Sequence, residues 1–532
     1  MEVESKEIDK ECRDEKSVSH EAVSKSFWSI PGPWPSLPLI GTEWYHFYRS
    51  LTGRNDLSKL HEVYIKKYHQ YGPIFKEEYR WRQPIVHIFD PNDFEIIFKA
   101  QGRCPIRPPN EFVSCFRASK PERYANIGLA NMNGLEWYKQ RQRLVPATMR
   151  LKTINENMHN QNEICEDFIN LLDQRRDSVT GRVDNIQDIT YRLALESICM
   201  LCLDCRIGAL VNVSDDDVSK VSNNNGRKLI ESTKLLFDTF NELYYGFPFW
   251  KLWPTNAWNN LVKAETEIYE IASEYVDEAI RNLNDRDPNE RQTVLETLLK
   301  TENLSIDEIK ITIIDLIIGG IFTVSNSFAF LIYHLAAHPD VQHKILDEMR
   351  SISPFSDHLD EFESNLFSME FINQMSYLKA CVQECFRLNC PVPGIMRTTS
   401  KSIVLSGYEI PENVSFRNTT VFSHFMATCR LEKYFQQPNR FRPERWIDPD
   451  EKATIHPFSL LPFGYGNRLC LGKRFTESEI YLTTVKLLKR FHLKLCEEFE
   501  TTGGSEKELE LKHCFIVIPA NPISIYLSPR NL

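Results

Sequence analysis

Residues 462–472 read Pro-Phe-Gly-Tyr-Gly-Asn-Arg-Leu-Cys-Leu-Gly, and a helical pattern begins at Lys473. Cys470 therefore ends a glycine-rich loop just before a helix N-terminus, where backbone N–H groups and the helix dipole stabilise a thiolate. The glycines allow the backbone to pass close to a flat, bulky object, and Arg468 can pair with an anionic group on that object. A thiolate ligand to a haem iron meets all of these demands.

The alternative interpretation of Cys470 is a structural cysteine buried in a glycine-rich turn. That is the simpler interpretation of an isolated cysteine, but it leaves the spacing of the loop unexplained. Two further segments carry charged side chains, and each is weak evidence by itself. Glu384 and Arg387 lie three residues apart, on one face of a predicted helix. Residues 441–446 read Phe-Arg-Pro-Glu-Arg-Trp.

Composition narrows the class of protein. The chain has 532 residues, of which 42% are hydrophobic and 26% charged, so a large core is expected and a wholly disordered, collagen-like or coiled-coil chain is excluded. Lys and Arg number 63 against 73 Asp and Glu, which gives a net charge of −10. A dedicated nucleic-acid-binding protein is usually basic, so we expect no nucleic-acid partner. The 14 cysteines predict neither a zinc site nor a disulfide framework, which fits a reducing compartment.

The longest apolar stretch runs from Leu316 to Ala337, carries no Asp, Glu, Lys or Arg, and is long enough to cross a membrane. The alternative is a helix buried inside a large protein. Polar residues in the middle of the stretch favour the buried helix. They are Thr323, Ser325, Asn326, Ser327 and His334.

Helical spacing dominates residues 135–390, and strand-like runs appear near both ends of the chain. The runs are Ile85–Phe89, Ser402–Ile410 with a hairpin turn at Ser406-Gly407, and Phe515–Ile518, which we expect to pair with Ile523–Tyr526. No repeat or linker divides the sequence. The pattern predicts a mostly α protein with a smaller β region, built as one domain over residues 30–532.

Residues 1–29 form a polar leader that we expect to be disordered. It contains no apolar run, so we expect neither a secretory signal nor an N-terminal membrane anchor. Its acids, such as Glu2, Glu4 and Asp9, also distinguish it from a mitochondrial transit peptide. An incorrectly assigned gene start is the alternative explanation.

In combination and in this order, the segments resemble the cytochrome P-450 family, from about Pro31 to the C-terminus. The family's loop pattern F-x-x-G-x-R-x-C-x-G is matched by Phe463, Gly466, Arg468, Cys470 and Gly472. The resemblance implies the cytochrome P-450 fold, with haem b buried between the long central helix and the cysteine loop. It also implies that Cys470 supplies the axial thiolate to the iron.

The other motifs of the family are present as well. Glu384 and Arg387 match its E-x-x-R helix, and Arg445 in the P-E-R-W segment completes, in the family, a buried network with that pair. The resemblance implies haem contacts through the W-x-x-x-R pair, an arginine downstream of E-x-x-R, and the cysteine loop. These residues are Trp137, Arg141, Arg397, Phe463, Arg468 and Cys470.

The chain departs from the family in its central helix, where an acid usually precedes an alcohol. Phe322 replaces the acid, and Thr323 keeps the alcohol. The family uses this pair to deliver protons, so Thr323 is the expected catalytic residue, whereas a phenyl ring cannot relay a proton. The alternative role of Thr323 is a hydroxyl bonded to a carbonyl one turn earlier. The substitution affects the proton route and not haem binding.

The resemblance implies a monooxygenase that inserts one oxygen atom of dioxygen into a C–H bond of an apolar substrate. An apolar pocket with few polar groups suits a steroid-like molecule. Family topology places five side chains at this pocket, although each could instead belong to the core. They are Phe322, Ile395, Met396, Phe515 and Ile516.

Electron delivery divides the family into microsomal members, which use a diflavin reductase, and mitochondrial members, which use a small acidic, adrenodoxin-like ferredoxin. Lys473 and Arg474 resemble the paired basic residues of mitochondrial members and would attract an acidic partner. A solvated helix start is the alternative, although cations there oppose the helix dipole. Lys379 matches the first of two lysines typical of mitochondrial members, whereas the second position holds Gln383.

The resemblance thus implies a mitochondrial enzyme on the matrix side of the inner membrane, in peripheral contact with it. The endoplasmic reticulum membrane is the alternative if the N-terminus is wrongly assigned. Residues 61–64, 71–75 and 323–333 resemble insect ecdysteroid hydroxylases. The alternatives are a xenobiotic-metabolising mitochondrial member, a peroxide-rearranging relative that needs no redox partner, and a haem protein without turnover.

Overall fold

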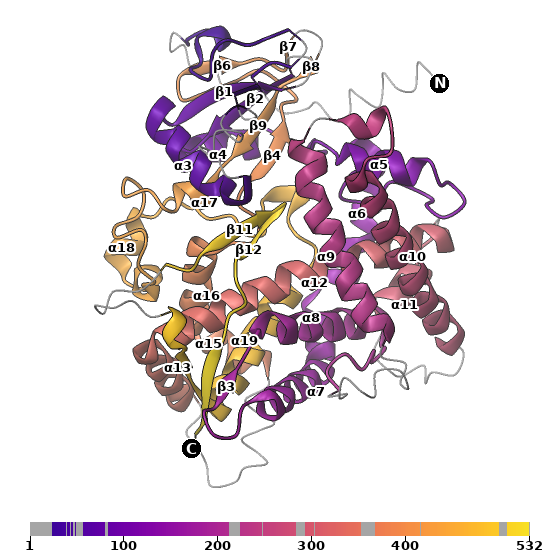
Figure 1. Ribbon diagram of the computed structural model, residues 1–532, viewed down its shortest axis with the longest axis vertical. Coiled ribbons are helices and arrows are strands. Elements are labelled where there is room, and N and C mark those ends of the chain that lie inside the picture. The colour runs from indigo at the N-terminus through magenta and orange to yellow at the C-terminus, as the bar shows by residue number, and fades with distance from the viewer. Residues whose placement is uncertain are drawn as a thin grey trace.

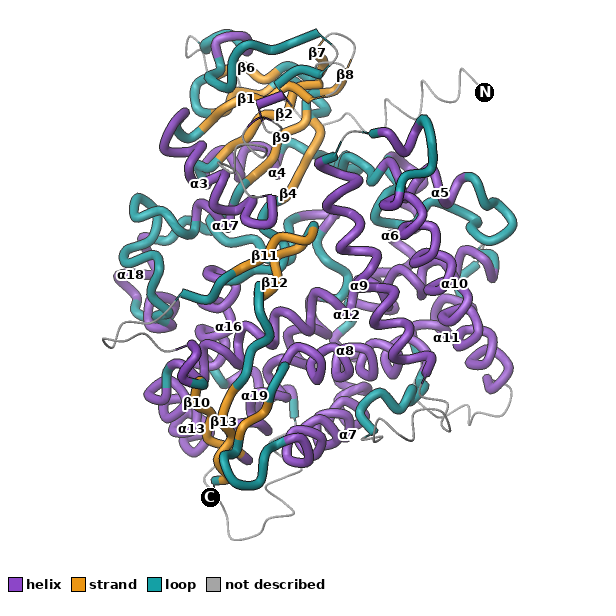
Figure 2. The backbone as a smooth tube through the Cα atoms, viewed as in Figure 1, coloured by secondary structure: helices purple, strands orange, loops and turns teal. Residues whose placement is uncertain are grey.

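The computed structural model describes residues 24–38, 40–42, 44–45, 48, 57–79, 83–211, 224–246, 248–283, 293–302, 304–352, 368–414, 417–499 and 508–530. Helices form most of the molecule, and the strands gather in small sheets (Figures 1 and 2). The helices that the argument uses are α3 Leu60–Tyr71, α4 Pro91–Lys99, α5 Glu111–Ala118, α6 Gly134–Thr148, α7 Leu151–Arg175, α8 Ile186–Leu203, α9 Asn224–Tyr245, α10 Asn256–Asn282, α11 Val294–Leu299, α12 Ile306–Ala337, α13 Pro339–Ile352, α15 Met369–Gln374, α16 Ser376–Leu388, α17 Phe425–Thr428, α18 Pro449–Thr454 and α19 Lys473–Arg490.

The largest sheet lies at one end of the molecule, beside α3, α4 and α17 (Figure 1). Its order is β1-β2-β9-β4, with β2 and β9 parallel and the outer pairs antiparallel. A second sheet, β10-β13-β3, joins the C-terminal strands to residues 182–183. The strands are β1 Ile74–Tyr79, β2 Gln83–Ile88, β3 Arg182–Val183, β4 Ile395–Thr398, β5 Ile403–Leu405, β6 Tyr408–Ile410, β7 Asn413–Val414, β8 Arg417–Asn418, β9 Thr420–Ser423, β10 Phe491–Leu495, β11 Leu511–Cys514, β12 Ile516–Pro519 and β13 Ile525–Pro529.

Helix α12 crosses the middle of the molecule and packs along α8 (Figure 1). It starts at a capping box in which Ser305 and Glu308 bond each other's backbone N–H groups. Among the described residues it alone is long and apolar enough to cross a membrane, yet 72% of its most apolar window is buried inside the protein. Its polar groups are satisfied internally: Asn326 donates to the Phe322 carbonyl at 2.7 Å, and His334 meets Asn389 at 2.6 Å. The structure therefore supports the buried core helix.

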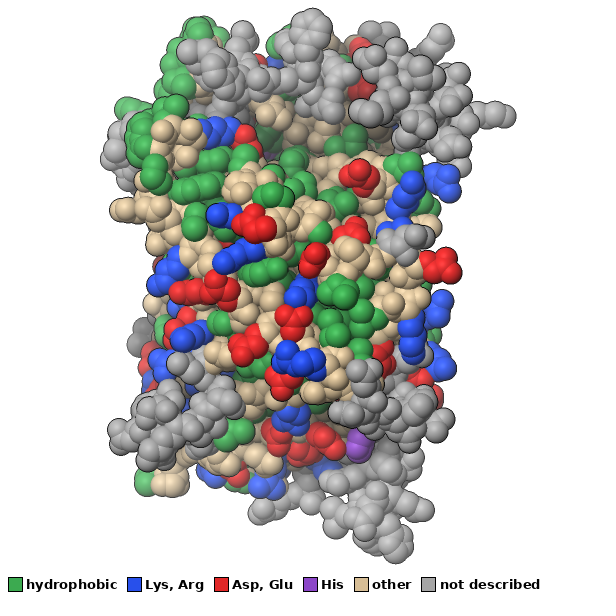
Figure 3. Space-filling model, turned by 90° about the vertical axis from the view of Figure 1, so that its right-hand side faces the viewer, with side chains coloured by type: hydrophobic (Ala, Val, Ile, Leu, Met, Phe, Trp, Pro, Cys, Tyr) green, Lys and Arg blue, Asp and Glu red, His purple; other side chains and the backbone are tan. Residues whose placement is uncertain are grey.

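The face formed by α5, α10 and α11 carries interspersed acidic and basic side chains (Figure 3). Several of them pair between elements, such as Arg123 with Glu270 at 3.2 Å and Lys310 with Asp277 at 2.7 Å. Exposed pairs of this kind add little stability each. Because acidic and basic side chains are interspersed, this face does not form a strongly acidic or strongly basic patch.

The predicted strands are present, but one predicted pairing is wrong. Residues 403–410 form the expected hairpin, with left-handed φ angles of 47° at Ser406 and 80° at Gly407 that suit a tight two-residue turn. By contrast, β12 pairs with β11, and β13 pairs with β10 and β3. Pro519 ends β12 and Pro522 follows within the connection, so neither can donate a ladder hydrogen bond between β12 and β13.

The predicted leader is too long at its C-terminal end. Residues 1–23 lie outside the described part of the chain, but residues 24–29 are ordered. Lys25 exchanges backbone hydrogen bonds of 2.8 and 2.9 Å with Gly407 and Glu409, and Phe27 is buried under the ammonium of Lys76. Burial of an aromatic ring and pairing with β6 hold this segment in place, and neither contact can be predicted from the composition of the segment.

The sequence also contains two overlapping C-x-x-C spacings, at Cys199, Cys202 and Cys205. All three thiols are free; the first two are buried in α8, and burial raises the pKa of Cys202 to about 12 and of Cys205 to about 11. No cluster of three or more His, Cys, Asp or Glu side chains in the described chain could hold a metal ion. These cysteines therefore pack as small apolar side chains.

Glu479 is a buried carboxyl at the junction of α8, α12 and α19, and no described cation pairs with it. Ser197 is its hydrogen-bonding partner, while Oε1 has no partner. Burial raises the pKa of Glu479 to about 8. The folded protein therefore holds a proton here that the unfolded chain releases at lower pH.

We predict that Glu479→Gln removes a pH dependence of stability. The contribution of Glu479 is most favourable below the ordinary pKa of 4.5 and is lost as pH rises to about 8. At pH 8 the variant should exceed the wild type in unfolding free energy by on the order of a few kcal/mol, and the difference should shrink toward pH 5. Denaturant unfolding at several pH values measures this, and parallel curves for the two proteins would contradict it.

Candidate active site

The loop that carries Cys470 is folded back on itself by its glycines. Gly464 and Gly466 adopt left-handed φ angles of 79° and 65°, and the Cys470 N–H donates to the Phe463 carbonyl at 2.8 Å. Helix α19 begins directly afterwards, at Lys473. The loop thus presents the sulfur at a helix N-terminus, as the sequence predicts.

The electrostatics at Cys470 differ from the expectation. Burial raises the pKa of the Cys470 thiol above its ordinary value, even though the N–H groups of Gly472 and Lys473 and the charge of Arg141 act in the opposite direction. The groups expected to stabilise the thiolate are therefore present, but together they lower the pKa less than desolvation raises it. A metal cation at the sulfur would supply the missing stabilisation of the thiolate.

The Cys470 side chain is nevertheless accessible to solvent, so its surface faces a space inside the protein. Gly319, midway along the mostly buried helix α12, is also accessible. A Cβ atom on Gly319 would meet nothing within 4 Å. The central helix and the cysteine loop thus both border open space, which a bulky cofactor requires.

Arginines from separate segments converge near this loop. Arg468 donates to the Pro105 carbonyl at 3.0 Å and to Asn133 Oδ1 at 2.7 Å, and lies 3.7 Å from the centre of the Trp137 ring. Arg141 on α6 donates to the Leu469 carbonyl. Arg397 on β4 is buried, and its Nη1 donates to the Met396 carbonyl at 2.8 Å.

These arginines have no anionic partner in the part of the chain that the structure describes. Burial first, and then repulsion by neighbouring arginines, lowers the pKa of both Arg397 and Arg468 to about 9. Arg107 is the first charge responsible in both cases. Within the described chain, no carboxylate pairs with Arg107, Arg141, Arg397 or Arg468. Such a cluster requires a bound anion, and the two carboxylates of haem fit it.

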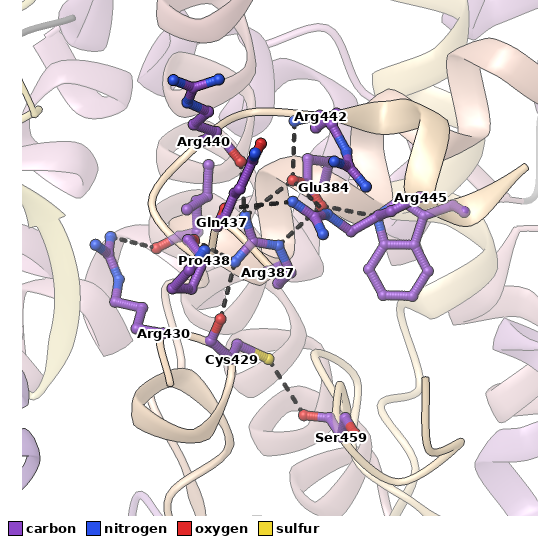
Figure 4. Close-up of polar contacts among 12 residues, drawn as sticks. Glu384, Arg387, Cys429, Arg430, Gln437, Pro438, Arg440, Arg442, Arg445 and Ser459 are labelled. Atoms are coloured by element: carbon purple, nitrogen blue, oxygen red, sulfur yellow. Dashed lines mark hydrogen bonds and ion pairs between the residues drawn. The ribbon is translucent and has the colours of Figure 1, made fainter. Parts of the chain in front are cut away.

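A fully buried ionic network supports this region (Figure 4). Arg387 donates to both carboxylate oxygens of Glu384 at 2.8 and 2.9 Å, and Arg445 donates to Glu384 at 3.0 Å. Burial alone would raise the pKa of Glu384, but the two arginines and the Arg442 N–H hold it below its ordinary value. The predicted grouping of Glu384, Arg387 and Arg445 is present in the structure.

Trp446 also belongs to this network, although no motif predicted its role. Its indole N–H donates to the second oxygen of Glu384 at 2.9 Å. Arg387 also donates to backbone carbonyls of Cys429, Pro438 and Arg440. The network therefore fixes the irregular segment 429–446 as well as α16. Carbonyls of a loop give no sequence signal, so these partners could not have been identified beforehand.

On the central helix, Thr323 Oγ1 donates to the Gly319 carbonyl at 2.6 Å, which is the alternative that the sequence left open. Its side chain remains partly exposed. Phe322 lies in the core, stacked between Tyr191 at 4.9 Å and Phe237 at 5.1 Å. The ring therefore points into an aromatic cluster between α8, α9 and α12.

The five expected pocket residues fall into two groups. Ile395, Met396 and Phe515 are half-buried, whereas Phe322 and Ile516 are buried in the core. Phe515 sits at the β11–β12 turn with a left-handed φ of 63°, and its ring meets Phe240 at 5.1 Å. Tyr244 contacts two of the half-buried residues: it donates to the Met396 sulfur at 3.3 Å, and its ring centre lies 6.1 Å from that of Phe515.

The three expected redox-partner cations gather around one carboxylate. Burial raises the pKa of Glu477, while Lys473, Lys379 and Arg474 act in the opposite direction. Arg474 donates to the Met149 carbonyl at 2.5 Å and borders an open groove between α6 and α7. The groove is lined by Val145, Pro146, Met149, Arg150, Leu151, Lys152 and Arg474. Glu477 and the groove were not predicted, because neither belongs to a motif.

Comparison with known proteins identifies the family. The family model Cytochrome P-450 matches residues 31–523. The chain is 32% identical to ecdysone 20-monooxygenase of Drosophila melanogaster over 518 residues, which covers 95% of this chain and 89% of that protein. It is 28% identical to cytochrome P-450 302a1, mitochondrial, of Drosophila melanogaster, over 96% of each chain. It is 29% identical to cytochrome P-450 12b1, mitochondrial, of Drosophila acanthoptera, over 88% of this chain and 87% of that protein.

The chain therefore belongs to the cytochrome P-450 family of haem-thiolate monooxygenases. The predicted family, the mostly α fold with small sheets and the class of enzyme are confirmed.

Proposed function

We propose that the protein is a monooxygenase in which Cys470 binds the iron of haem b and Arg141, Arg397 and Arg468 receive its carboxylates. The observation that carries this proposal is the set of buried arginines, with no anionic partner among the described residues, beside an accessible cysteine. Bound haem supplies oxygen activation and C–H oxidation, which amino-acid side chains cannot. The chain supplies the sulfur ligand, the binding of the carboxylates and the exclusion of water.

Thr323 is the residue we assign to proton transfer. Its hydroxyl is partly exposed in the stretch of α12 that contains accessible Gly319. When the hydroxyl turns away from the Gly319 carbonyl, Oγ1 can donate its proton and accept another from water. Phe322 offers no titratable atom and lies turned into the core. Proton delivery therefore depends on the hydroxyl and water rather than on a neighbouring acid.

The substrate we propose is a steroid, specifically an ecdysteroid. The half-buried side chains of Ile395, Met396 and Phe515, backed by Phe240 and Tyr244, offer an apolar wall with a single phenol. Such a wall suits a rigid apolar skeleton with a few hydroxyl groups. One relative is named ecdysone 20-monooxygenase, in agreement with the sequence resemblance. A xenobiotic-metabolising enzyme is the second candidate, because other relatives are mitochondrial members without a steroid name.

An optical titration of the purified ferric holoprotein tests the substrate and the ligand together. We expect ecdysone to shift the Soret band from low spin to high spin at micromolar concentration, because a bound substrate displaces water from the iron. Cys470→Ser should lose the thiolate type of spectrum, while Cys115→Ser, at an exposed cysteine, should keep it. A thiolate spectrum that responds to xenobiotics and not to ecdysteroids would favour the second candidate.

The electron donor we propose is a small acidic ferredoxin, which would place the protein in mitochondria, on the matrix side of the inner membrane. Only the carboxylate of Glu477 lies among the three cations Lys379, Lys473 and Arg474, so this surface keeps an excess of positive charge. Arg150 and Lys152 extend it along the groove between α6 and α7. The exposed apolar floor of that groove, including Leu151, can bury part of the partner. Two relatives are named mitochondrial.

Charge reversal tests this surface. We predict that Lys473→Glu with Arg474→Glu slows ferredoxin-driven reduction about tenfold or more at low salt and flattens its salt dependence, because electrostatic steering is lost. Arg150→Glu with Lys152→Glu should act in the same direction without altering the loop next to Cys470. Lys120→Glu, at an exposed lysine of another segment, is the matched control. Equal rates in all variants would exclude the surface.

Peripheral membrane contact is proposed for the connection between α9 and α10. Phe249, Leu252 and Trp253 are 48%, 76% and 52% exposed there. Aromatic and leucine side chains in one short segment can enter the interface of a bilayer. We predict that Leu252→Ser with Trp253→Ser lowers co-sedimentation with cardiolipin-containing vesicles at least about threefold while the haem spectrum is unchanged. Unchanged sedimentation would contradict the contact.

A further inference from the structure

Helix α5 and the segment that follows it form one unit, residues 110–131, beside the proposed substrate pocket. Asn131 Oδ1 accepts the Asn110 N–H at 2.9 Å, so the end of the unit is joined to its start. Phe112 on α5 packs against the ring of Phe240 at 5.0 Å, and Phe240 backs the pocket wall. The position of this unit therefore determines one side of the pocket.

A buried cation fastens the unit to two long helices. Arg117, in the last turn of α5, donates to both carboxylate oxygens of Glu265 on α10 at 3.1 and 3.4 Å, and to Asp315 on α12 at 2.8 Å. The side chains of Arg117 and Glu265 are only 4% and 3% exposed. Burial opposes the charge of Arg117, but Asp315 and Glu265 outweigh it and raise the pKa of the guanidinium. Separation of these partners would leave charges uncompensated, so the ion cluster resists opening.

The rest of the unit closes over the same ion cluster. Tyr124 donates to Glu265 Oε2 at 3.3 Å, and its ring centre lies 5.3 Å from the guanidinium of Arg117. Gly128 has a left-handed φ of 86°, and a Cβ atom there would come within 2.3 Å of Asp315 Oδ2. Glycine therefore lets the backbone pass the carboxylate at this distance. Both α5 and the segment after it are held by the same three charged side chains.

The other end of α5 adjoins the exposed apolar connection between α9 and α10. Glu111, in the first turn of α5, pairs with Lys251 of that connection. Leu252 and Trp253, which follow Lys251, are the exposed side chains proposed above to enter a bilayer. An apolar substrate concentrates in a bilayer because transfer out of water is favourable. The unit thus lies between the source of such a substrate and the pocket that receives it.

We propose that residues 110–131 form a gate to the substrate pocket, and that Arg117 keeps this gate shut through its pairing with Glu265 and Asp315. Substrate enters when the unit moves away from α10 and α12, and the ion cluster then forms again behind it. Arg117 acts through α5 and is a positioning residue. The proposal rests on the pocket of the proposed function and adds the route into it.

Ligand-binding kinetics of the purified holoprotein test the gate. The probe is clotrimazole, a bulky azole that binds haem iron whether or not ecdysone is the natural substrate. Asp315→Asn removes one charge from the ion cluster and keeps the shape of the side chain. We expect this variant to speed both association and dissociation of clotrimazole about tenfold, with Kd changed less than about threefold, because both directions share the same opening step.

Two controls isolate the ion cluster. Asp277→Asn removes a carboxylate that pairs instead with Lys310 at 2.7 Å, between the same two helices, and should leave the clotrimazole rates unchanged. Carbon monoxide rebinding after photolysis should be equal in all proteins, because a ligand of two atoms does not require the gate. Equal clotrimazole rates in Asp315→Asn and the wild type would overturn the proposal. Faster dissociation alone would also overturn it, because that result indicates a damaged pocket.

Hydrogen exchange of the wild-type holoprotein requires no substitution and decides the matter if Asp315→Asn does not bind haem. Amides of α5 and of residues 119–131 should exchange at least about threefold more slowly with clotrimazole bound, because the ligand stabilises the shut gate by mass action. Unchanged exchange there would overturn the gate. Gated binding of clotrimazole without any response to ecdysone would support the gate and count against the proposed substrate.

Discussion

The interaction on which the rest of the structure depends is the buried carboxylate of Glu384. This carboxylate accepts hydrogen bonds from Arg387, Arg445, the Trp446 indole and the Arg442 N–H, and the side chains of this network are almost completely buried. Removal of one partner would leave an uncompensated charge in the core, at a cost of about 3–5 kcal/mol. The network thereby fixes an irregular segment that has no regular backbone pairing. Phe386, on the same helix, meets Phe463 of the cysteine loop at 5.4 Å, so the loop rests on this support.

The cations of the haem site are arranged in a different way from those around Glu384. Arg387 and Arg445 both pair with the carboxylate of Glu384, whereas Arg107, Arg397 and Arg468 repel one another. Burial of such cations is unfavourable in the protein alone and becomes favourable with a bound dianion. The same holds at Cys470, where burial outweighs the backbone N–H groups. An anionic cofactor that carries a metal ion would offset both of these unfavourable terms.

The amino-acid sequence predicts this site well where the chemistry is local. The order of residues between Phe463 and Gly472 specifies a turn, a sulfur and a cation within one loop, and Ser406-Gly407 specifies its own hairpin. Non-local contacts were predicted less well. The predicted pairing of β12 and β13 was wrong because the sequence of a strand does not specify which strand it pairs with. Lys25 and Phe27 were assigned to a disordered leader, although contacts with β6 and Lys76 hold them in place.

The sequence by itself thus determined the family, the mostly α fold and the residues of the buried network, and it predicted the sulfur ligand, because each depends on short spacings along one helix or loop. Only the tertiary structure decided which charges are balanced. Arg117 belongs to no motif and pairs with Glu265 and Asp315 because the fold brings α5 against α10 and α12. Phe322 likewise turned out to belong to an aromatic core. Burial and long-range proximity, which set electrostatic energies, exist only once the chain has folded.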